Sequence, residues 1–344
     1  MLAADPPLVN PLPADAAEAD PAAVHVAKEI AHGRPLLGGR FHPSGETLFV
    51  SSEDFQVWRY RISDDVKVAY PTEAWVRGIV FPSDEVLVTG GYDGRLIWWP
   101  TTGDAPQPLR IVAAHQGWIR AVAISADRSL LATCGNDLIV RLWSAETGEP
   151  RGEFTGHERH IYHVAFHPSG ESLVAGDLIA QFRQWSIATG ELQREFKMPT
   201  LHKYDAGFQA DYGGPYCLTF DPSGAKLIGG GITNVSNAFA GVGNPAVAVI
   251  DWESGEEQLA HLSKAGTQGK TWGVIWHPDD FVIAAIGGQG GGWLIFWKAG
   301  EKDEFHAFNL GNSARDLDLH PDGITLASVH HDGKIRLSKM APAV

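Results

Sequence analysis

The residues best suited to chemistry in this sequence are histidines that lie close together at two places. The segment 157–163 (HERHIYH) has three histidines spaced three residues apart, and the segment 330–332 reads His-His-Asp. On a helix, that spacing would gather the imidazoles on one face, where they could hold a metal ion. In a strand, side chains alternate between two sides and adjacent histidines diverge. Because the surrounding sequence has the pattern of strands, we predict no metal site and no catalytic residue at either place.

Two other features could carry chemistry, a glycine-rich run and two cysteines. The run at 287–292 (GGQGGG) does not introduce a helix, so it lacks the helix N-terminus that lets glycine loops hold phosphate. Cys134 and Cys217 are too few for a disulfide framework or a thiolate zinc site, and we expect buried thiols. We find no pair of Asp or Glu residues that the sequence would place at catalytic distance from each other. The sequence therefore predicts no cofactor and favours a protein that is not an enzyme.

The composition excludes several classes of partner. The chain has 344 residues, with 27 Lys and Arg against 41 Asp and Glu, a formal net charge of −14. Binding to nucleic acid or to anionic membranes needs a surplus of positive charge, so we expect neither partner. No stretch approaches the ~18 consecutive apolar residues of a membrane span. With 44% hydrophobic residues, the chain can bury a substantial core.

A tight turn preceded by a large apolar residue occurs seven times along the chain. The most regular copies read Phe-His-Pro-Ser-Gly, in which Pro presets φ and Ser or Gly accommodates the turn. The leading residues are Phe41, Phe81, Ile124, Phe166, Phe220, Trp276 and Leu319, with spacings of 40, 43, 42, 54, 56 and 43 residues. An internal repeat of this length predicts a repeat architecture.

Each turn is followed by the pattern of further short strands. In the third copy, the runs 130–135 (LLATCG), 139–143 (IVRLW) and 152–157 (GEFTGH) are separated by turns. Four short strands in ~40 residues indicate one blade of a β-propeller.

The repeat resembles that of the WD-repeat family of β-propellers, over about residues 24–338. Gly-His at 156–157 matches the family's loop between blades, and Leu-Trp-Ser at 142–144 stands where the family usually has Trp-Asp. The resemblance implies an all-β fold, a seven-bladed propeller of four-stranded antiparallel blades. After Leu319 the chain has room for only three strands, so we expect the strand at 24–30 to complete the last blade and close the ring. The alternative is an unpaired N-terminal arm.

The chain divides into a short leader and one propeller domain, at 24–344. Residues 1–23 are rich in Ala, Pro and Asp and contain no Lys or Arg, so they lack the basic region of a secretory signal. We expect this leader to be disordered; alternatively, its start is the remnant of a leader that was removed. We expect a cytoplasmic protein, with export and a leader absent from this chain as the alternative.

The resemblance implies a buried hydrogen-bond network in each blade, made by a His, a Ser or Thr, an Asp and a Trp. The third blade carries all four, as His115, Thr133, Asp137 and Trp143. The other blades keep only part of the set. A Ser/His/Asp group could also suggest nucleophilic catalysis, but here the network gives these residues a structural role.

The resemblance also places two residues per blade at the upper mouth of the channel. We call this side, where the loops between blades lie, the top face. Of these fourteen positions, five are aromatic, four are Lys or Arg and none is Asp or Glu. Adding two residues that precede turn aspartates gives the predicted rim: Trp75, Arg77, Tyr92, Trp118, Arg120, His160, Tyr162, Tyr216, Trp272, Arg315 and His331. Trp, Tyr and Arg concentrate binding energy in interfaces, so we predict a binding surface; the alternative is packing between blades.

The two longest spacings predict two insertions in the fifth blade, both on the top face. One insertion, at 197–214, enters the blade, and the other, at 231–246, joins its second and third strands. Loops longer than simple connectors are often functional. The residues predicted to bind a partner there are Tyr204, Asp205, Phe208, Tyr212, Asn234 and Phe239.

These observations favour a non-enzymatic interaction module that binds a protein segment or peptide on its top face. Aromatic residues would anchor the segment, and arginines would pair with an anionic group on it. The alternative is an enzyme or small-molecule receptor that uses the channel mouth, with the insertions as a lid. An enclosed cavity with convergent titratable groups would favour that alternative. We expect a monomer.

Overall fold

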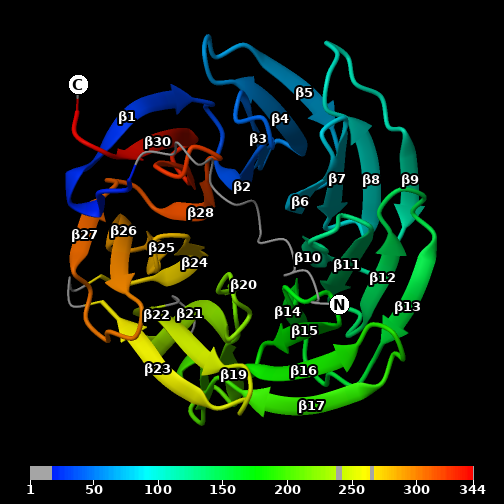
Figure 1. The fold of residues 1–344 in the computed structure, drawn as a ribbon, viewed down its shortest axis with the longest axis vertical. Coiled ribbons are helices and arrows are strands. Elements are labelled where there is room, and N and C mark those ends of the chain that lie inside the picture. The colour runs from blue at the N-terminus through cyan, green and yellow to red at the C-terminus, as the bar shows by residue number, and fades with distance from the viewer. Residues whose placement is uncertain (1–17, 238–241, 264–266, 344) are drawn as a thin grey trace, which may run out of the picture.

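The computed structural model describes residues 18–237, 242–263 and 267–343. In these residues the chain forms seven four-stranded antiparallel sheets, arranged as blades around a ring (Figure 1). In each blade, the first strand lies nearest the centre of the ring and the fourth lies at its edge. The predicted fold class is therefore confirmed, including the number of blades.

The first four blades are meanders of four consecutive strands. Blade one consists of β2 (Leu36–Phe41), β3 (Thr47–Ser52), β4 (Gln56–Arg61) and β5 (Lys67–Pro71). Blade two consists of β6 (Val76–Ser83), β7 (Val86–Gly91), β8 (Arg95–Pro100) and β9 (Arg110–Ala113). Blade three consists of β10 (Ile119–Ile124), β11 (Leu130–Gly135), β12 (Val140–Ser144) and β13 (Pro150–Phe154). Blade four consists of β14 (Ile161–Phe166), β15 (Ser172–Asp177), β16 (Gln181–Ser186) and β17 (Leu192–Lys197).

The fifth blade differs because extra elements surround it. A short 3-10 helix, η2 (Pro199–Leu201), and a hairpin of β18 (His202–Asp205) and β19 (Ala210–Gly213) precede it. The blade itself consists of β20 (Cys217–Phe220), the long strands β21 (Lys226–Asn237) and β22 (Val242–Asp251), and β23 (Glu257–Leu262). Blade six consists of β24 (Lys270–His277), β25 (Phe281–Gly288), β26 (Gly291–Lys298) and β27 (His306–Asn309).

The last blade combines the two ends of the chain. It consists of β28 (Ala314–Leu319), β29 (Thr325–His330), β30 (Lys334–Met340) and the N-terminal strand β1 (Val24–Ala31). Strand β1 pairs antiparallel with β30 from Val24 opposite Met340 to Ala31 opposite Lys334, which closes the ring as predicted.

Part of the predicted leader lies against this last blade. The 3-10 helix η1 (Pro21–Ala23) is capped by Asp20, whose backbone N–H also donates to the carbonyl of Met340 at 2.9 Å. Residues 20–23, which the sequence assigned to the leader, thus contact the last blade. Residues 1–17 lie outside the described residues.

The repeated turns connect neighbouring blades on the side opposite the top face. In four of them the histidine reaches a backbone carbonyl in a turn of the following blade: His42 reaches Asp84, His167 reaches Gly224, His277 reaches Gly323 and His320 reaches Gly45, at 2.7–3.0 Å. The turn glycines have positive φ, and a Cβ on Gly45 would stand 2.4 Å from the His320 ring. The His-Pro pattern therefore fixes one blade to the next as well as making a turn.

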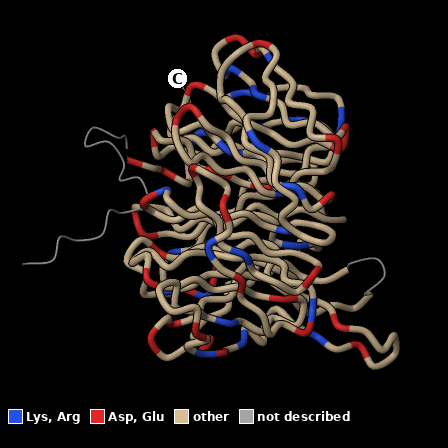
Figure 2. Tube along the Cα trace, turned by 90° about the vertical axis from the view of Figure 1, so that its right-hand side faces the viewer, with Lys and Arg blue, Asp and Glu red and all other residues tan. Residues whose placement is uncertain are grey.

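The core lies between blades, where apolar side chains from adjacent sheets meet. Between blades four and five, Phe182 and Phe196 stack at 5.4 Å and pack with Leu218 and Leu227. Viewed edge-on, the ring is a thick disc, and the β18–β19 hairpin projects from one face at the lower right of Figure 2. None of the described residues forms a helix that is long and apolar enough to cross a membrane.

Candidate binding site on the top face

The four residues predicted to form the blade-three network are hydrogen-bonded to one another below the top face. His115 Nε2 lies 2.7 Å from Thr133 Oγ1, and His115 Nδ1 lies 2.8 Å from Asp137 Oδ1. The indole of Trp143 donates to the same Thr133 hydroxyl at 2.9 Å. Burial lowers the pKa of His115, so its ring is neutral at pH 7. The set satisfies buried polar groups and holds the loop between blades in place.

The three histidines of the segment 157–163 have different environments. His157 is buried, with Nδ1 2.8 Å from a carboxylate oxygen of Asp177. His160 is exposed on the top face, and His163 is half-buried on β14, where Nδ1 contacts the carbonyl of the next residue. Burial lowers the pKa of His163 to about 4. Residues 157–160 form a loop and β14 begins at Ile161, so the three histidines do not share one helical face.

Two partners in these networks come from positions that the sequence pattern did not indicate. In blade four, the family position for the acid holds Ile179, and the carboxylate comes from Asp177 at the end of β15. In blade seven, Ser328 Oγ lies 2.8 Å from His330 Nε2, so the histidine comes from β29. The adjacent His331 is exposed on the top face. These alternative hydrogen-bond partners can be identified only when the positions of the neighbouring strands are known.

An arc of four aromatic side chains runs along the top of blades one to three. The ring centroids of Phe55 and Trp75 are 6.3 Å apart, and those of Trp75 and Tyr92 are 6.0 Å apart. Tyr92 and Trp118 stack at 4.3 Å with nearly parallel planes. Phe55, Trp75 and Trp118 are 51%, 37% and 42% exposed, so the arc presents apolar surface to solvent. The sequence did not indicate Phe55, which lies in a turn outside the fourteen rim positions.

The aromatic arc continues into blades four to six through an arginine. The guanidinium of Arg120 lies 5.1 Å from the centroid of Trp118 and 4.7 Å from that of Tyr162. Tyr162 contacts Tyr216 at 5.5 Å, and Tyr216 contacts Trp272 at 5.0 Å. These last three rings are half-buried. We call the whole series the aromatic belt: Phe55, Trp75, Tyr92, Trp118, Tyr162, Tyr216 and Trp272.

Side chains meet across the opening of the ring. Arg77 lies on β6 of blade two, and its guanidinium is 5.4 Å from the ring centroid of Trp272 on β24 of blade six. Figure 1 shows these two strands on opposite sides of the central opening. The mouth of the channel is therefore spanned by a cation and an aromatic ring.

Three cations at the mouth have neutral partners. Arg77 donates to the carbonyl of Leu37 at 3.0 Å, and Arg120 donates to the side-chain oxygen of Asn136 at 2.8 Å. Lys270 donates to the hydroxyl of Tyr216 at 3.1 Å. Within the described parts of the chain, no carboxylate forms an ion pair with any of the three. We call Arg77, Arg120 and Lys270 the mouth cations.

The tyrosines of the mouth stay neutral and do not offset the charge of the arginines. Burial raises the pKa of Tyr216 to about 12, against the opposing effect of Arg120 and Arg77, so the phenol stays neutral. Burial also raises the pKa of Tyr162 and lowers that of Lys270. The mouth thus holds positive charge that its tyrosines do not neutralise.

The fourth predicted cation of the rim is paired internally. Arg315 forms an ion pair with Glu53 at 3.0 Å, and both side chains are about three-quarters buried. It therefore differs from the mouth cations, and the expectation that all arginines of the rim are available is wrong for Arg315. The sequence could not show this, because Glu53 lies outside the rim positions.

The two insertions of blade five lie together. The ammonium of Lys203 on β18 donates to the carbonyl of Val235 on β21 at 2.7 Å. Tyr212 and Tyr216 pack against Ile232 and Val235, which joins the insertions to the aromatic belt.

The remaining residues predicted in the insertions have varied environments. Tyr204 and Phe208 are exposed on the hairpin, and the Asp205 side chain accepts a hydrogen bond from the N–H of Gly207. Asn234 is exposed and has a positive φ of 49°. Phe239 lies outside the described residues.

Comparison with known proteins supports the repeat pattern. The model of the "WD domain, G-beta repeat" matches residues 106–144 and 148–178. Apoptotic protease-activating factor 1 of Rattus norvegicus is 30% identical over 166 residues, 47% of this chain and 13% of that protein. Eukaryotic translation initiation factor 3 subunit I of Aspergillus fumigatus is 26% identical over 148 residues, 43% of this chain and 38% of that protein. Transcription initiation factor TFIID subunit 5 of Caenorhabditis elegans is 29% identical over 160 residues, 46% of this chain and 24% of that protein.

The ring of seven four-stranded blades, closed by β1, defines the protein as a seven-bladed β-propeller. The matched repeats and the relatives show that the chain is similar to proteins with WD repeats, as the sequence resemblance implied. Two of these relatives are named as subunits of larger factors. The chain spans less than two thirds of the length of each of these relatives.

Proposed function

We propose that this propeller is a non-enzymatic interaction module whose top face binds a segment of another protein that carries an anionic group. The observation that carries the proposal is the set of mouth cations, Arg77, Arg120 and Lys270. They are half-buried, have neutral hydrogen-bond partners and lie within one aromatic belt.

The electrostatics support an anion as the bound group. Like charges held around one opening repel each other, and partial burial strengthens that repulsion. An anionic side chain seated among the mouth cations would relieve it and would form charge-assisted hydrogen bonds. The protein is otherwise acidic, with a net charge of −14, so a positive mouth would also direct an acidic segment to this face.

The aromatic belt supports a peptide rather than a small ion as the ligand. Trp75 and Trp118 are partly exposed and preordered by contact with Tyr92, edge-on for Trp75 and stacked for Trp118, so they lose little conformational freedom on binding. Tyr204 on the hairpin stands exposed beside this face. An extended segment would lie along the belt, with its anionic group at the mouth.

The alternative function, an enzyme or small-molecule receptor, requires an enclosed cavity at the mouth. The contact of Arg77 with Trp272 spans the opening instead. The same contact gives a peptide a continuous surface on which to lie. We therefore favour the interaction module.

A peptide array tests the proposal. The full chain is applied to peptides in which aromatic residues flank Glu, Asp or phosphoserine, and to counterparts with Gln, Asn or Ser. We expect retention of the acidic set, lost as salt is added. Arg120→Ala should weaken retention roughly tenfold, by loss of a charge-assisted hydrogen bond.

The matched control is Arg128→Ala, which removes an arginine that pairs with Asp84 in the turns opposite the top face. It should bind as the wild type does. Equal retention of acidic and neutral peptides, or an Arg120→Ala protein that binds unchanged, would refute the proposal.

A further inference from the structure

The grooves between neighbouring blades share one recurring position on the fourth strand. On the third strand of each blade, we take the residue three positions before the Trp of the network. The fourth-strand residue that pairs with it is the recurring position, and its side chain packs toward the next blade. In six blades it is apolar or aromatic: Tyr70, Val112, Phe154, Phe196, Phe308 and Ile30. Blade five has His261 there, opposite Val247. A polar ring thus replaces a core residue at one groove only among the seven.

His261 is buried without the hydrogen bonds that an imidazole needs. The residue is 1% exposed, and neither ring nitrogen makes a hydrogen bond of normal geometry within the described residues, although the backbone carbonyl of Glu301 lies near enough to raise the pKa of the ring. Its ring centroid lies 5.3 Å from that of Trp297 in blade six, whose indole nitrogen is also unpartnered in this part of the chain. Buried polar groups are rarely left unpaired, because the loss of their hydration is costly. A partner from outside the chain is therefore expected.

The ring lines a pocket of about 160 Å³ between blades five and six. Val249, Leu259 and Trp276 form apolar walls, and the ammonium of Lys226 lies 5.2 Å from the ring centroid of Trp276. Burial lowers the pKa of His261 to about 4; the nearby carbonyl of Glu301 opposes this effect and Lys226 adds to it. The pocket therefore presents one positive charge, a neutral imidazole, the amide of Gln258 and apolar walls.

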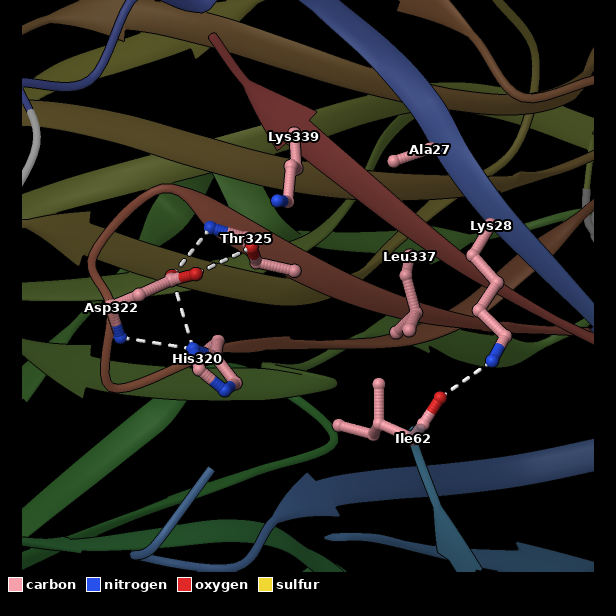
Figure 3. Close-up of a pocket in the computed structure, with 8 residues that line it drawn as sticks. All are labelled: Ala27, Lys28, Ile62, His320, Asp322, Thr325, Leu337 and Lys339. Carbon is pink, nitrogen blue, oxygen red and sulfur yellow. Dashed lines mark hydrogen bonds and ion pairs between the residues drawn. The ribbon is translucent and has the colours of Figure 1, made fainter. Parts of the chain in front are cut away.

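The structural counterpart of this pocket lies between blades seven and one, where Lys28 and His320 both have internal partners (Figure 3). Both pockets are lined by the second, third and fourth strands of one blade and by the next blade. In the counterpart, Lys28 pairs with Asp65 at 2.7 Å and donates to the carbonyl of Ile62 at 2.5 Å. His320 pairs with Asp322 at 3.1 Å. For Lys226, the described residues provide no side-chain hydrogen bond or ion pair.

We propose that the pocket between blades five and six binds a carboxylate, which accepts hydrogen bonds from Lys226 Nζ and from a ring N–H of His261. One ammonium beside a neutral imidazole matches a single negative charge, whereas a phosphate dianion would keep an unpaired charge. The apolar walls suit a short hydrocarbon chain behind the carboxylate. Two sources offer this chemistry: an Asp or Glu side chain of a partner protein, and a free short-chain carboxylic acid.

The test uses the full chain with ¹⁵N-labelled histidine and follows the ring resonances of His261 by NMR. Sodium propionate is titrated against sodium chloride of equal ionic strength, and His261→Phe assigns the signals. We expect a saturable shift with propionate alone. Lys226→Met should weaken binding about tenfold or more, because it removes a charge-assisted hydrogen bond. Lys28→Met, the matched change in the counterpart groove, should leave the titration unchanged.

A second arm identifies the source of the carboxylate. The probe is the capped tripeptide acetyl-Gly-Glu-Gly-amide, with its Gln counterpart as the control. Tighter binding of the Glu peptide than of propionate would point to a partner protein, and the reverse order would point to a free acid. If neither probe shifts His261, or if Lys226→Met responds as the wild type does, the proposal is wrong. The ring signals of His261 could also indicate a stable hydrogen bond that neither probe changes. That result would mean that only a buried water occupies the pocket, and it would also overturn the proposal.

Discussion

Blades three and six place the same residue in different surroundings. Trp143 on β12 donates to Thr133, which is bonded in turn to His115. Trp297 on β26 is as deeply buried, but Ala284 occupies the strand position of Thr133, and the indole has no hydrogen-bond partner among the described residues. Blade three also lies within the matched repeat at 106–144. The regular blade satisfies all its network groups and so contributes rigidity.

The irregular blades, five and six, add further features that we connect with binding to the arginines and aromatic rings of blades one to four. Blade five has both insertions, blade six supplies Lys270 and Trp272 to the mouth, and the pocket with His261 lies between them. Polar groups without internal partners are available to a ligand, whereas satisfied ones are not. The comparison indicates that the blades without the full network keep buried polar groups unpartnered among the described residues, whereas the regular blade three still contributes Arg120 and Trp118 to the mouth.

The largest expected effect breaks the network of blade three. Trp143→Ala removes a buried aromatic ring and the donor to Thr133, and should lower the free energy of unfolding by about 3–5 kcal/mol. Denaturant unfolding measures it. An unchanged midpoint would mean that Trp143 does not hold the third strand of its blade as described.

The next effect concerns the unsatisfied polar group of blade five. His261→Phe introduces the residue type found at the equivalent Phe154 and Phe196, and removes an unpaired imidazole. We expect a gain of about 1–3 kcal/mol in the free energy of unfolding at neutral pH, in the absence of a bound carboxylate. A loss of stability would show that the imidazole already has a partner.

The same substitution should change the pH dependence. Burial lowers the pKa of His261 to about 4 in the folded protein, from its ordinary value of 6.5, so the unfolded chain binds the proton more readily. The free energy of unfolding therefore does not depend on this group above pH 6.5, and it decreases as the pH falls from 6.5 toward 4. His261→Phe should therefore reduce the fall of the melting temperature over this range. His331→Gln, at an exposed site, serves as the control and should leave the fall unchanged.

A matched pair of substitutions sharpens the comparison of the two tryptophans. Trp143→Phe deletes a donor that is used, and Trp297→Phe deletes one that is not. Both lose similar ring volume, so the hydrogen bond is the main difference. Trp143→Phe should be the more destabilising by about 1 kcal/mol in denaturant unfolding. Equal losses would remove the distinction between the two blades.

The smallest stability effects belong to the rim. Arg315→Ala breaks a partly buried ion pair with Glu53 and should cost about 0–1 kcal/mol. Arg120→Ala should change stability by a similar amount, yet should weaken binding of acidic peptides, which Arg315→Ala leaves nearly unchanged. Melting curves and the peptide array together separate the two roles. If Arg315→Ala impairs binding more than Arg120→Ala does, the internal pairing of Arg315 is not its role.

The amino-acid sequence by itself determined the architecture. Turn residues and the alternation of apolar residues are local signals, and their seven copies predicted the blades. The resemblance to the WD-repeat family then implied the closing strand and the residues of the blade-three network. Six of the seven rings in the aromatic belt, all except Phe55, were also among the predicted rim residues, because the repeat places equivalent positions on one face.

Only the tertiary structure decided which of these groups are free to bind. Arg315 pairs with Glu53, whereas Arg77 lies over the ring of Trp272. Both contacts join blades that are distant in the sequence. The same is true of Asp177, which replaces a missing acid, and of His261, whose apolar surroundings come from two sheets. Local patterns fix where a strand begins and which way its side chains alternate, whereas pairing of charges and burial of polar groups depend on distances across the ring.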